Sequence, residues 1–277
     1  MITLSLSILF LAQNFGESKD YLIWDADRSP EKESGPALER SLRQSGYTGD
    51  YTADLTTYLD SLSNYCAVFV CLGSRPDNTI LYDSMNVVNS LVEFLNTGGN
   101  LYIEGGETWA AWDNPKTLLH ELIHIEGGRG GERSLLNHLY GISGKLAQNM
   151  VFPFRGKNSW IDSLVPIPPA ETLFINWPPY TVCAVSYEDP RIGFKTIGAA
   201  FEFGGLQDTF HLGSPVGAKS ILADSMMHFF GCIIPPSEPL LNEEEKNSKN
   251  IFIFPEPMLP SSIPPLIQKI TPLLPFR

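Results

Sequence analysis

The sequence predicts an α/β protein with a doubly wound, mostly parallel sheet and a strand-rich C-terminal half. Over the first half of the chain, short apolar runs typical of strands covered on both faces alternate with segments of helical periodicity. Residues 98–106 (GGNLYIEGG) then place an apolar run between two glycine pairs, the second of which turns the chain sharply. Because open α/β sheets build their sites at the carboxyl ends of such strands, we expect a functional site there.

The first elements follow from local patterns. A strand is expected at residues 20–25, which end in an acid, and a helix over residues 34–47. Ser34 is suited to cap that helix, and Pro36 falls in its first turn, where a missing amide proton costs no hydrogen bond. The next expected elements are strands at residues 51–53 and 66–72, a helix at 85–95 and a strand at 101–103.

A repeated motif follows the glycine turn. Residues 117–127 (TLLHELIHIEG) form a predicted helix with a glycine stop, and residues 134–144 (SLLNHLYGISG) repeat its leucine, isoleucine and glycine positions. From Lys145 onward the pattern changes to strands separated by proline-rich turns. A last helix is expected over residues 218–230, ending at Gly231.

The charge balance argues against nucleic acid as a partner. The chain has 277 residues, with 31 Asp and Glu against 19 Lys and Arg, so its formal net charge is −12. Phosphate backbones are bound by clustered cations, which this chain does not offer. Hydrophobic residues make up 43% of the chain, enough for a substantial core, and we expect no membrane span.

The four cysteines show no CxxC spacing. Cys66 and Cys71 lie five positions apart on one expected strand, so their side chains point to opposite faces and cannot easily bridge. We therefore expect all four, including Cys183 and Cys232, to be buried thiols without a disulfide framework.

Three segments are expected along the chain. Residues 1–16 contain an apolar core typical of a signal peptide, and the alternative is a strand at the sheet edge. Residues 17–233 form the α/β domain. Residues 234–277 are dense in proline and charge, and they are expected to be a linker and an incomplete C-terminal module. The expected location is therefore secreted or at the cell surface.

Several stretches carry a resemblance to a known family: IWDAD, SGPALERSLRQSGY, GGNLYIEGGETWA, NSWIDSLVPI and FKTIGAAFEFGGL. Together, over about residues 20–232, they resemble an uncharacterised domain of secreted bacterial surface proteins. That domain has a class I glutamine amidotransferase-like variant of the flavodoxin-like fold. The resemblance implies this fold and export, with other domains of a cell-surface protein as partners, and it implies no particular ligand.

Amidotransferase chemistry is not expected. It needs a cysteine nucleophile at the sharp turn and a histidine on a later strand to activate it. Here the turn reads Glu104-Gly105-Gly106-Glu107, and Glu202 falls about where the resemblance would place the histidine. Because both groups are missing, the sequence predicts a non-catalytic domain.

The motif HELIH offers an alternative chemistry. His120 and His124 are spaced to share one helix face and hold zinc, with Glu121 as the general base of a metallopeptidase. The longer form of the motif has its third ligand at the position of Gly130, which cannot bind metal. A catalytic zinc needs three protein ligands, so we expect no cofactor, with zinc as the alternative.

The favoured interpretation of HELIH is a scaffold helix. Placed on a helix over residues 116–125, Leu118, Leu122 and Ile125 form one stripe that packs on the sheet. The two histidines are then expected to face outward.

Acidic residues gather at the expected strand ends. They are suited to bind a cation such as calcium, or they form a solvated acidic rim. Trp109, with Trp112 and Trp160, is suited either to stack on a sugar or peptide or to pack in the core. The ligand-binding candidates are Asp25, Asp27, Glu104, Glu107, Trp109 and Glu202.

The leading hypothesis is a secreted, non-catalytic binding or spacer module of a bacterial surface protein. The alternatives are a zinc-dependent metallopeptidase that uses HELIH and a glycan- or peptide-binding domain at the acidic strand edge.

Overall fold

The structure is a computed structural model, and it describes residues 19–29, 33–73, 81, 84–109, 116–128, 136–142, 144–211 and 214–233. The chain divides into two units, Met1–Pro235 and Pro236–Arg277, and all described residues belong to the first. The expected signal peptide at residues 1–16 and the expected linker at residues 234–277 lie outside the described residues. Among the helices that the structure describes, none has the length and apolar character needed to cross a membrane.

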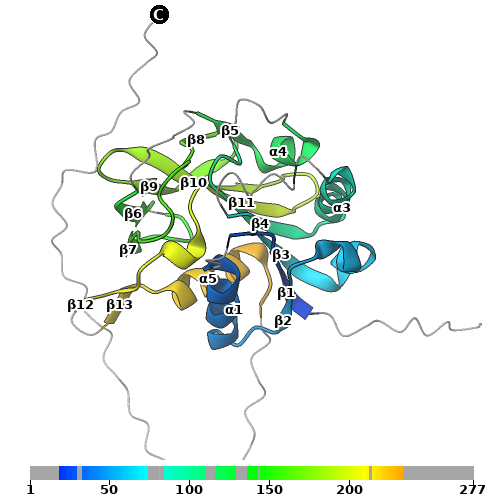
Figure 1. Ribbon diagram of the computed structural model, residues 1–277, viewed down its shortest axis with the longest axis horizontal. Coiled ribbons are helices and arrows are strands. Elements are labelled where there is room, and N and C mark those ends of the chain that lie inside the picture. Colours follow the sequence, from blue (N-terminus) through cyan, green and yellow to red (C-terminus); the bar gives the residue numbers. More distant parts are fainter. Residues whose placement is uncertain are drawn as a thin grey trace, which may run out of the picture. The chain divides into compact units, whose positions relative to one another are not determined.

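One nine-stranded sheet forms the centre of the domain (Figure 1). Its strands are β1 Lys19–Asp25, β2 Gly49–Thr52, β3 Tyr65–Cys71, β4 Asn100–Glu104, β6 His138–Gly141, β7 Val151–Pro153, β9 Glu171–Asn176, β10 Thr181–Glu188 and β11 Lys195–Ala199. Their order is β2-β1-β3-β4-β11-β10-β9-β6-β7. The neighbours from β2 to β11 pair in parallel, and the neighbours from β11 to β7 pair antiparallel.

The predicted α/β fold with a large, partly parallel sheet is confirmed. The expected strand-rich C-terminal half joins the same sheet through antiparallel pairs, so the sheet is mixed. We call the strands from β2 to β11 the parallel half and the strands from β10 to β7 the antiparallel half. Two short pairs lie outside this sheet: β5 Ile125–Gly127 with β8 Leu164–Pro166, and β12 Thr209–His211 with β13 Ser214–Gly217.

Helices accompany the parallel half. The α-helices are α1 Ser34–Gln44, α3 Met85–Asn96, α4 Leu118–Ile123 and α5 Lys219–Phe230, and the 3₁₀ helices are η1 Leu55–Asn64 and η2 Phe203–Gly205. The helices α1 and α5 pack against each other, as Figure 1 shows, and α3 packs against η1. Leu38 and Leu42 of α1 and Val88 and Leu91 of α3 are buried, which is why these amphipathic segments form helices on the sheet.

Most predicted elements of the parallel half are confirmed within about two residues. The strands β1, β3 and β4 and the helix α3 match their expected ranges closely, and α5 ends at Gly231 in the left-handed conformation that glycine favours. The helix α1 is three residues shorter than expected because the chain turns at Gly46, which also has a positive φ.

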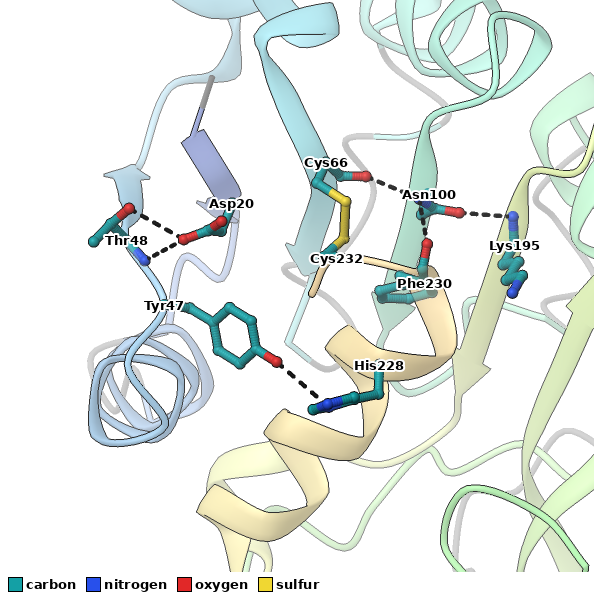
Figure 2. Close-up of a disulfide and its surroundings, with 9 residues drawn as sticks. All are labelled: Asp20, Tyr47, Thr48, Cys66, Asn100, Lys195, His228, Phe230 and Cys232. Atoms are coloured by element: carbon teal, nitrogen blue, oxygen red, sulfur yellow. Dashed lines mark hydrogen bonds between the residues drawn. A yellow bond between two sulfur atoms is a disulfide. The ribbon is translucent and has the colours of Figure 1, made fainter. Parts of the chain in front are cut away.

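The cysteine prediction is wrong for two of the four residues. Cys66 at the start of β3 forms a disulfide with Cys232, just beyond α5, with a Cα–Cα distance of 5.9 Å (Figure 2). The spacing argument excluded only a Cys66–Cys71 bridge, whereas this bridge joins residues 166 positions apart. Cys71 and Cys183 are buried free thiols, as predicted.

Asn100 forms three hydrogen bonds beside this disulfide. Its Nδ2 donates to the carbonyls of Cys66 at 2.9 Å and Phe230 at 3.2 Å, and its Oδ1 accepts from the Lys195 amide at 3.0 Å (Figure 2). One buried amide side chain therefore joins β3, β4, β11 and the end of α5 beside the disulfide.

The two copies of the repeated motif fold differently. The first copy forms α4 and β5, whereas residues His138–Gly141 of the second form β6. Pairing with β9 on one side and β7 on the other gives the second copy its extended backbone, so tertiary context overrides the shared sequence pattern.

Candidate functional site

The expected site lies on one row of residues at the carboxyl ends of the parallel strands. Asp25 of β1 lies beside Cys71 of β3, Cys71 lies beside Glu104 of β4, and Glu104 lies beside Ala199 of β11. Asp27 and Glu202 follow β1 and β11 in the chain. The structure therefore brings these acids to one edge of the sheet, as the sequence predicted.

Asp25 is buried under the first turn of α1. Its Oδ2 accepts a hydrogen bond from the Tyr51 hydroxyl. Gly35 in α1 lies so close that a Cβ added there would be 2.7 Å from the same oxygen. A carboxylate at a helix N-terminus interacts favourably with the exposed amide groups and the helix dipole.

Asp27 is held by its own loop. The amide and the hydroxyl of Ser29 donate to its two oxygens at 2.8 and 2.9 Å, which is the local turn that aspartate commonly forms. Gly73, with a φ of +72°, approaches Asp27 so closely that a Cβ there would collide with the carboxylate.

Glu104 is fully buried. Its Oε2 accepts from the Tyr102 hydroxyl at 2.6 Å and from the Phe203 amide at 2.7 Å. The pKa of Glu104 is raised to about 8. Burial is the main cause and the nearby Glu202 adds to it, whereas Ser34, Tyr102 and the Phe203 amide act in the opposite direction. At neutral pH this carboxyl is therefore mainly protonated.

Cys71 is the thiol nearest to this acidic row. Its burial, together with the negative charges of nearby carboxylates, raises its pKa well above the ordinary value. The carboxylates that act on it are Glu104, Asp25, Asp27 and Glu202. Nucleophilic cysteines need the opposite surroundings, with cationic groups and partial exposure.

The glycine turn after β4 has the sharp geometry predicted for it. The Gly105 amide donates to the Ala199 carbonyl and the Gly106 amide donates to the Gly73 carbonyl, both at 3.1 Å. Glu107 follows with a φ of +54°, an uncommon conformation for a residue with a side chain. Glu107 is buried, and it stands where an amidotransferase would need a cysteine.

Trp109 is a core residue. Only 3% of it is exposed, its indole Nε1 donates to the Ala199 carbonyl at 3.1 Å, and its amide donates to Asp162 at 2.8 Å. It therefore has no open ring face for a sugar or a peptide. Trp160 is half-buried with a φ of +61°, and Trp112 lies outside the described residues.

The structure corrects the predicted orientation of HELIH. His120 is buried, whereas Leu118, expected on the sheet, is 54% exposed. The Thr117 amide donates to Nδ1 of His120 at 3.1 Å, which leaves Nε2 to donate to the Thr108 carbonyl at 3.0 Å. Burial lowers the pKa of this imidazole. His120 thus caps its own helix and attaches it to the turn after β4.

His124 lies outside the helix. The helix α4 ends at Ile123, and His124 adopts a left-handed conformation with its ring stacked on Tyr187, 4.0 Å between ring centroids. Glu121 is exposed. The two histidines therefore do not share a helix face. In the part of the chain that the structure describes, no group of three or more His, Cys, Asp or Glu side chains is placed to hold a metal.

The sequence analysis did not identify the residues that form hydrogen bonds at this edge of the sheet. Tyr51 and Tyr102 bond to the acids, and Asp162 receives the Trp109 amide. The alternation of side chains along the strands gave a usable indication for Tyr102, because it places Tyr102 on the same face as Glu104. No local pattern links Asp162, 53 positions away, to Trp109.

Comparisons with known proteins extend the description of the fold. No protein-family model and no curated protein sequence matches the chain. A ThuA-like protein from Bacteroides uniformis ATCC 8492 is similar in structure, with a TM-score of 0.52 and 10% identity over 77% of this chain and 91% of that chain. At this identity the likeness shows a shared fold alone.

Two further solved structures are similar with TM-scores below 0.5. The N-terminal domain of mmIFT52 has a TM-score of 0.49 and 14% identity over 76% of this chain and 96% of that chain. A glutamine amidotransferase from Methylobacillus flagellatus has a TM-score of 0.45 and 9% identity over 78% of this chain and 93% of that chain.

Proposed function

We propose that this chain is an exported, non-catalytic α/β domain that acts as a binding or spacer module at a bacterial cell surface. One observation carries the non-catalytic part of the proposal: the carboxyl groups at the strand ends are buried and bonded by the domain itself. Asp25, Asp27 and Glu104 receive their hydrogen bonds from Tyr51, Ser29 and Tyr102. An edge that ordinarily admits a substrate is here a packed polar core.

The chemistry of the edge supports the same proposal. Acyl-transfer enzymes place an activated nucleophile at the turn after the central strand. Here that turn carries Glu107, and the neighbouring thiol of Cys71 is surrounded by carboxyl groups. A buried, mainly protonated Glu104 can donate a hydrogen bond, but its side chain is not exposed to solvent.

The disulfide supports export. Bridges such as Cys66–Cys232 form and persist in oxidising compartments and are rare in reducing cytosol. The two remaining thiols, Cys71 and Cys183, are both buried, which protects them from oxidation and exchange in such a compartment.

The strand order supports the finer fold assignment. The run β2-β1-β3-β4-β11 has the order of the flavodoxin-like sheet, and α1 with α5 and α3 with η1 form two separate helical pairs. We infer a doubly wound arrangement of the amidotransferase-like kind, to which the antiparallel half is added.

Export is tested with the full chain fused to alkaline phosphatase, which is active only outside the cytoplasm, in a Gram-negative host. We expect phosphatase activity, and the secreted protein should yield a disulfide-linked Cys66–Cys232 peptide. Activity that stays absent while the fusion protein accumulates would contradict export.

The non-catalytic part is tested by thiol titration of the non-reduced protein. We expect no fast-reacting thiol in the native protein and two after denaturation, Cys71 and Cys183. A Cys71 that reacts rapidly in the native state would be an activated nucleophile and would overturn this part of the proposal.

A further inference from the structure

Aromatic side chains are exposed together in the antiparallel half. Trp177 is 55% exposed, Tyr180 58% and Tyr140 36%, and His138 is exposed beside them. We call these four residues the aromatic platform. Large aromatic side chains are ordinarily buried, so a group of them on one surface indicates a binding site.

Backbone pairing places the platform residues next to one another. Tyr140 of β6 lies opposite Ile175 of β9, and the Trp177 amide donates to the His138 carbonyl at 3.0 Å. The rings of His138 and Tyr140 lie 6.5 Å apart between centroids. Tyr180 is the last residue of the four-residue turn, 177–180, that joins β9 to β10.

The turn that carries Trp177 and Tyr180 is held rigidly. Asn137 Nδ2 donates to the Pro178 carbonyl and Asn176 Nδ2 donates to the Pro179 carbonyl, each at 2.7 Å. The Asn137 amide donates in turn to Asn176 Oδ1 at 2.7 Å. Because Asn176 is fully buried, the domain uses a core amide to fix a surface turn. Such preorganisation lowers the entropy that binding costs.

The chemistry of the platform selects a class of ligand. Apart from His138, none of its residues carries a charge, so it offers no ion pair to a charged peptide or lipid. The chain's net charge of −12 also disfavours an anionic ligand. Trp and Tyr combine a flat apolar face with a polar tip, which suits a sugar ring with its apolar face and its rim of hydroxyl groups.

We propose that the aromatic platform binds a neutral polysaccharide, with sugar rings stacked on Trp177 and Tyr180 and the hydroxyls contacting the polar tips of the neighbouring side chains. This inference rests on the proposed binding role and assigns its ligand class. It places the site in the antiparallel half, away from the acidic edge.

The test is affinity electrophoresis of the full chain in native gels that contain a soluble β-glucan, a galactomannan or a xylan. We expect at least one polysaccharide to retard the protein. Trp177→Ala should raise the dissociation constant at least about tenfold, and Trp177→Phe, which keeps a ring, should retain most of the retardation. Phe210→Ala is the matched control, because Phe210 is 66% exposed on β12 outside the platform.

Each outcome decides the proposal. Retardation that is lost in Trp177→Ala and kept in Phe210→Ala supports it, provided that both variants melt like the parent protein. Three results overturn it: no retardation by any of the polysaccharides, equal retardation of Trp177→Ala and the parent, or loss of retardation in Phe210→Ala as well as in Trp177→Ala. Any of these would leave the export and thiol results standing, so a wrong ligand class is distinguishable from a wrong proposed function.

Discussion

The parallel and antiparallel halves of the sheet differ in the exposure of their acidic and aromatic side chains. In the parallel half, acids at the strand ends are buried and bonded by neighbouring tyrosines, serines and amides. In the antiparallel half, tryptophan and tyrosine side chains are exposed on a turn held by two asparagines. The comparison teaches that the acids at the carboxyl ends of the parallel strands are buried, whereas the aromatic side chains of the antiparallel half are exposed.

The sharpest test of this comparison is a pair of tryptophan variants. Trp109→Ala in the parallel half should lower the free energy of unfolding by about 3–5 kcal/mol, because it removes a buried ring and the hydrogen bond from its indole Nε1 to the Ala199 carbonyl. Trp177→Ala should change it by less than about 0.5 kcal/mol, because Trp177 is exposed. Urea denaturation measures both, and equal losses would show that the aromatic platform is part of the core.

The disulfide is expected to have the next largest effect. Cys66→Ser combined with Cys232→Ser should lower the free energy of unfolding by about 2–5 kcal/mol, because the bridge restricts a long segment of the unfolded chain. A reductant should destabilise the parent protein by a similar amount and leave the double variant unchanged. The reductant is added to the unfolded parent protein, where any bridge is accessible. If the free energy of unfolding then stays unchanged, the bridge does not form.

Glu104 should make stability depend on pH. Its folded-state pKa of about 8 is raised above the ordinary value of 4.5, so its contribution is complete below about pH 4.5 and is lost as pH rises through about 8. The parent protein should therefore lose about 2–4 kcal/mol across this window relative to Glu104→Gln, whose side chain stays neutral. Denaturation at pH 5 and pH 9 measures the difference.

The control for this pH effect is Glu171→Gln. Glu171 is an exposed partner of Lys145, so Glu171→Gln should change the free energy of unfolding by less than about 0.5 kcal/mol. If Glu171→Gln and Glu104→Gln give the same profile, Glu104 is ionised and solvated, and the acidic edge is open.

The smallest expected effect concerns His120. His120→Ala should lower the free energy of unfolding by about 1–3 kcal/mol, because it leaves the Thr117 amide and the Thr108 carbonyl without this buried partner. A chelator and added zinc should both leave the melting temperature of the parent protein unchanged. One zinc per chain that survives dialysis and is lost in His120→Ala would restore the metallopeptidase alternative.

Local patterns predicted much of the parallel half. The strands β1, β3 and β4 are continuous apolar runs and α3 has clear helical spacing, so each could be read within a short window. The acidic edge followed as well, because parallel strands place their carboxyl ends together and Asp25 and Glu104 end two of them.

Local patterns could not predict which distant segment of the chain contacts a given residue. Nothing near Cys66 indicates that Cys232 will reach it, and the leucine frame of residues 134–144 does not disclose that β9 draws part of it into the sheet. The outward orientation predicted for His120 is wrong. The helix α4 has only six residues and His120 caps it, so the hydrogen bonds of this side chain decide the orientation of the helix more than its hydrophobic periodicity does.

The sequence by itself determined the alternation of strands and helices, the sharp turn after β4 and the lack of cysteine or serine at residues 104–107, because these depend on residue type and near-neighbour spacing. Only the tertiary structure decided that the acids are buried and that Cys66 and Cys232 form a disulfide. It also decided that Trp109 is buried while Trp177 is exposed. Burial and hydrogen-bond partners depend on segments far apart in the chain, so no short pattern contains them.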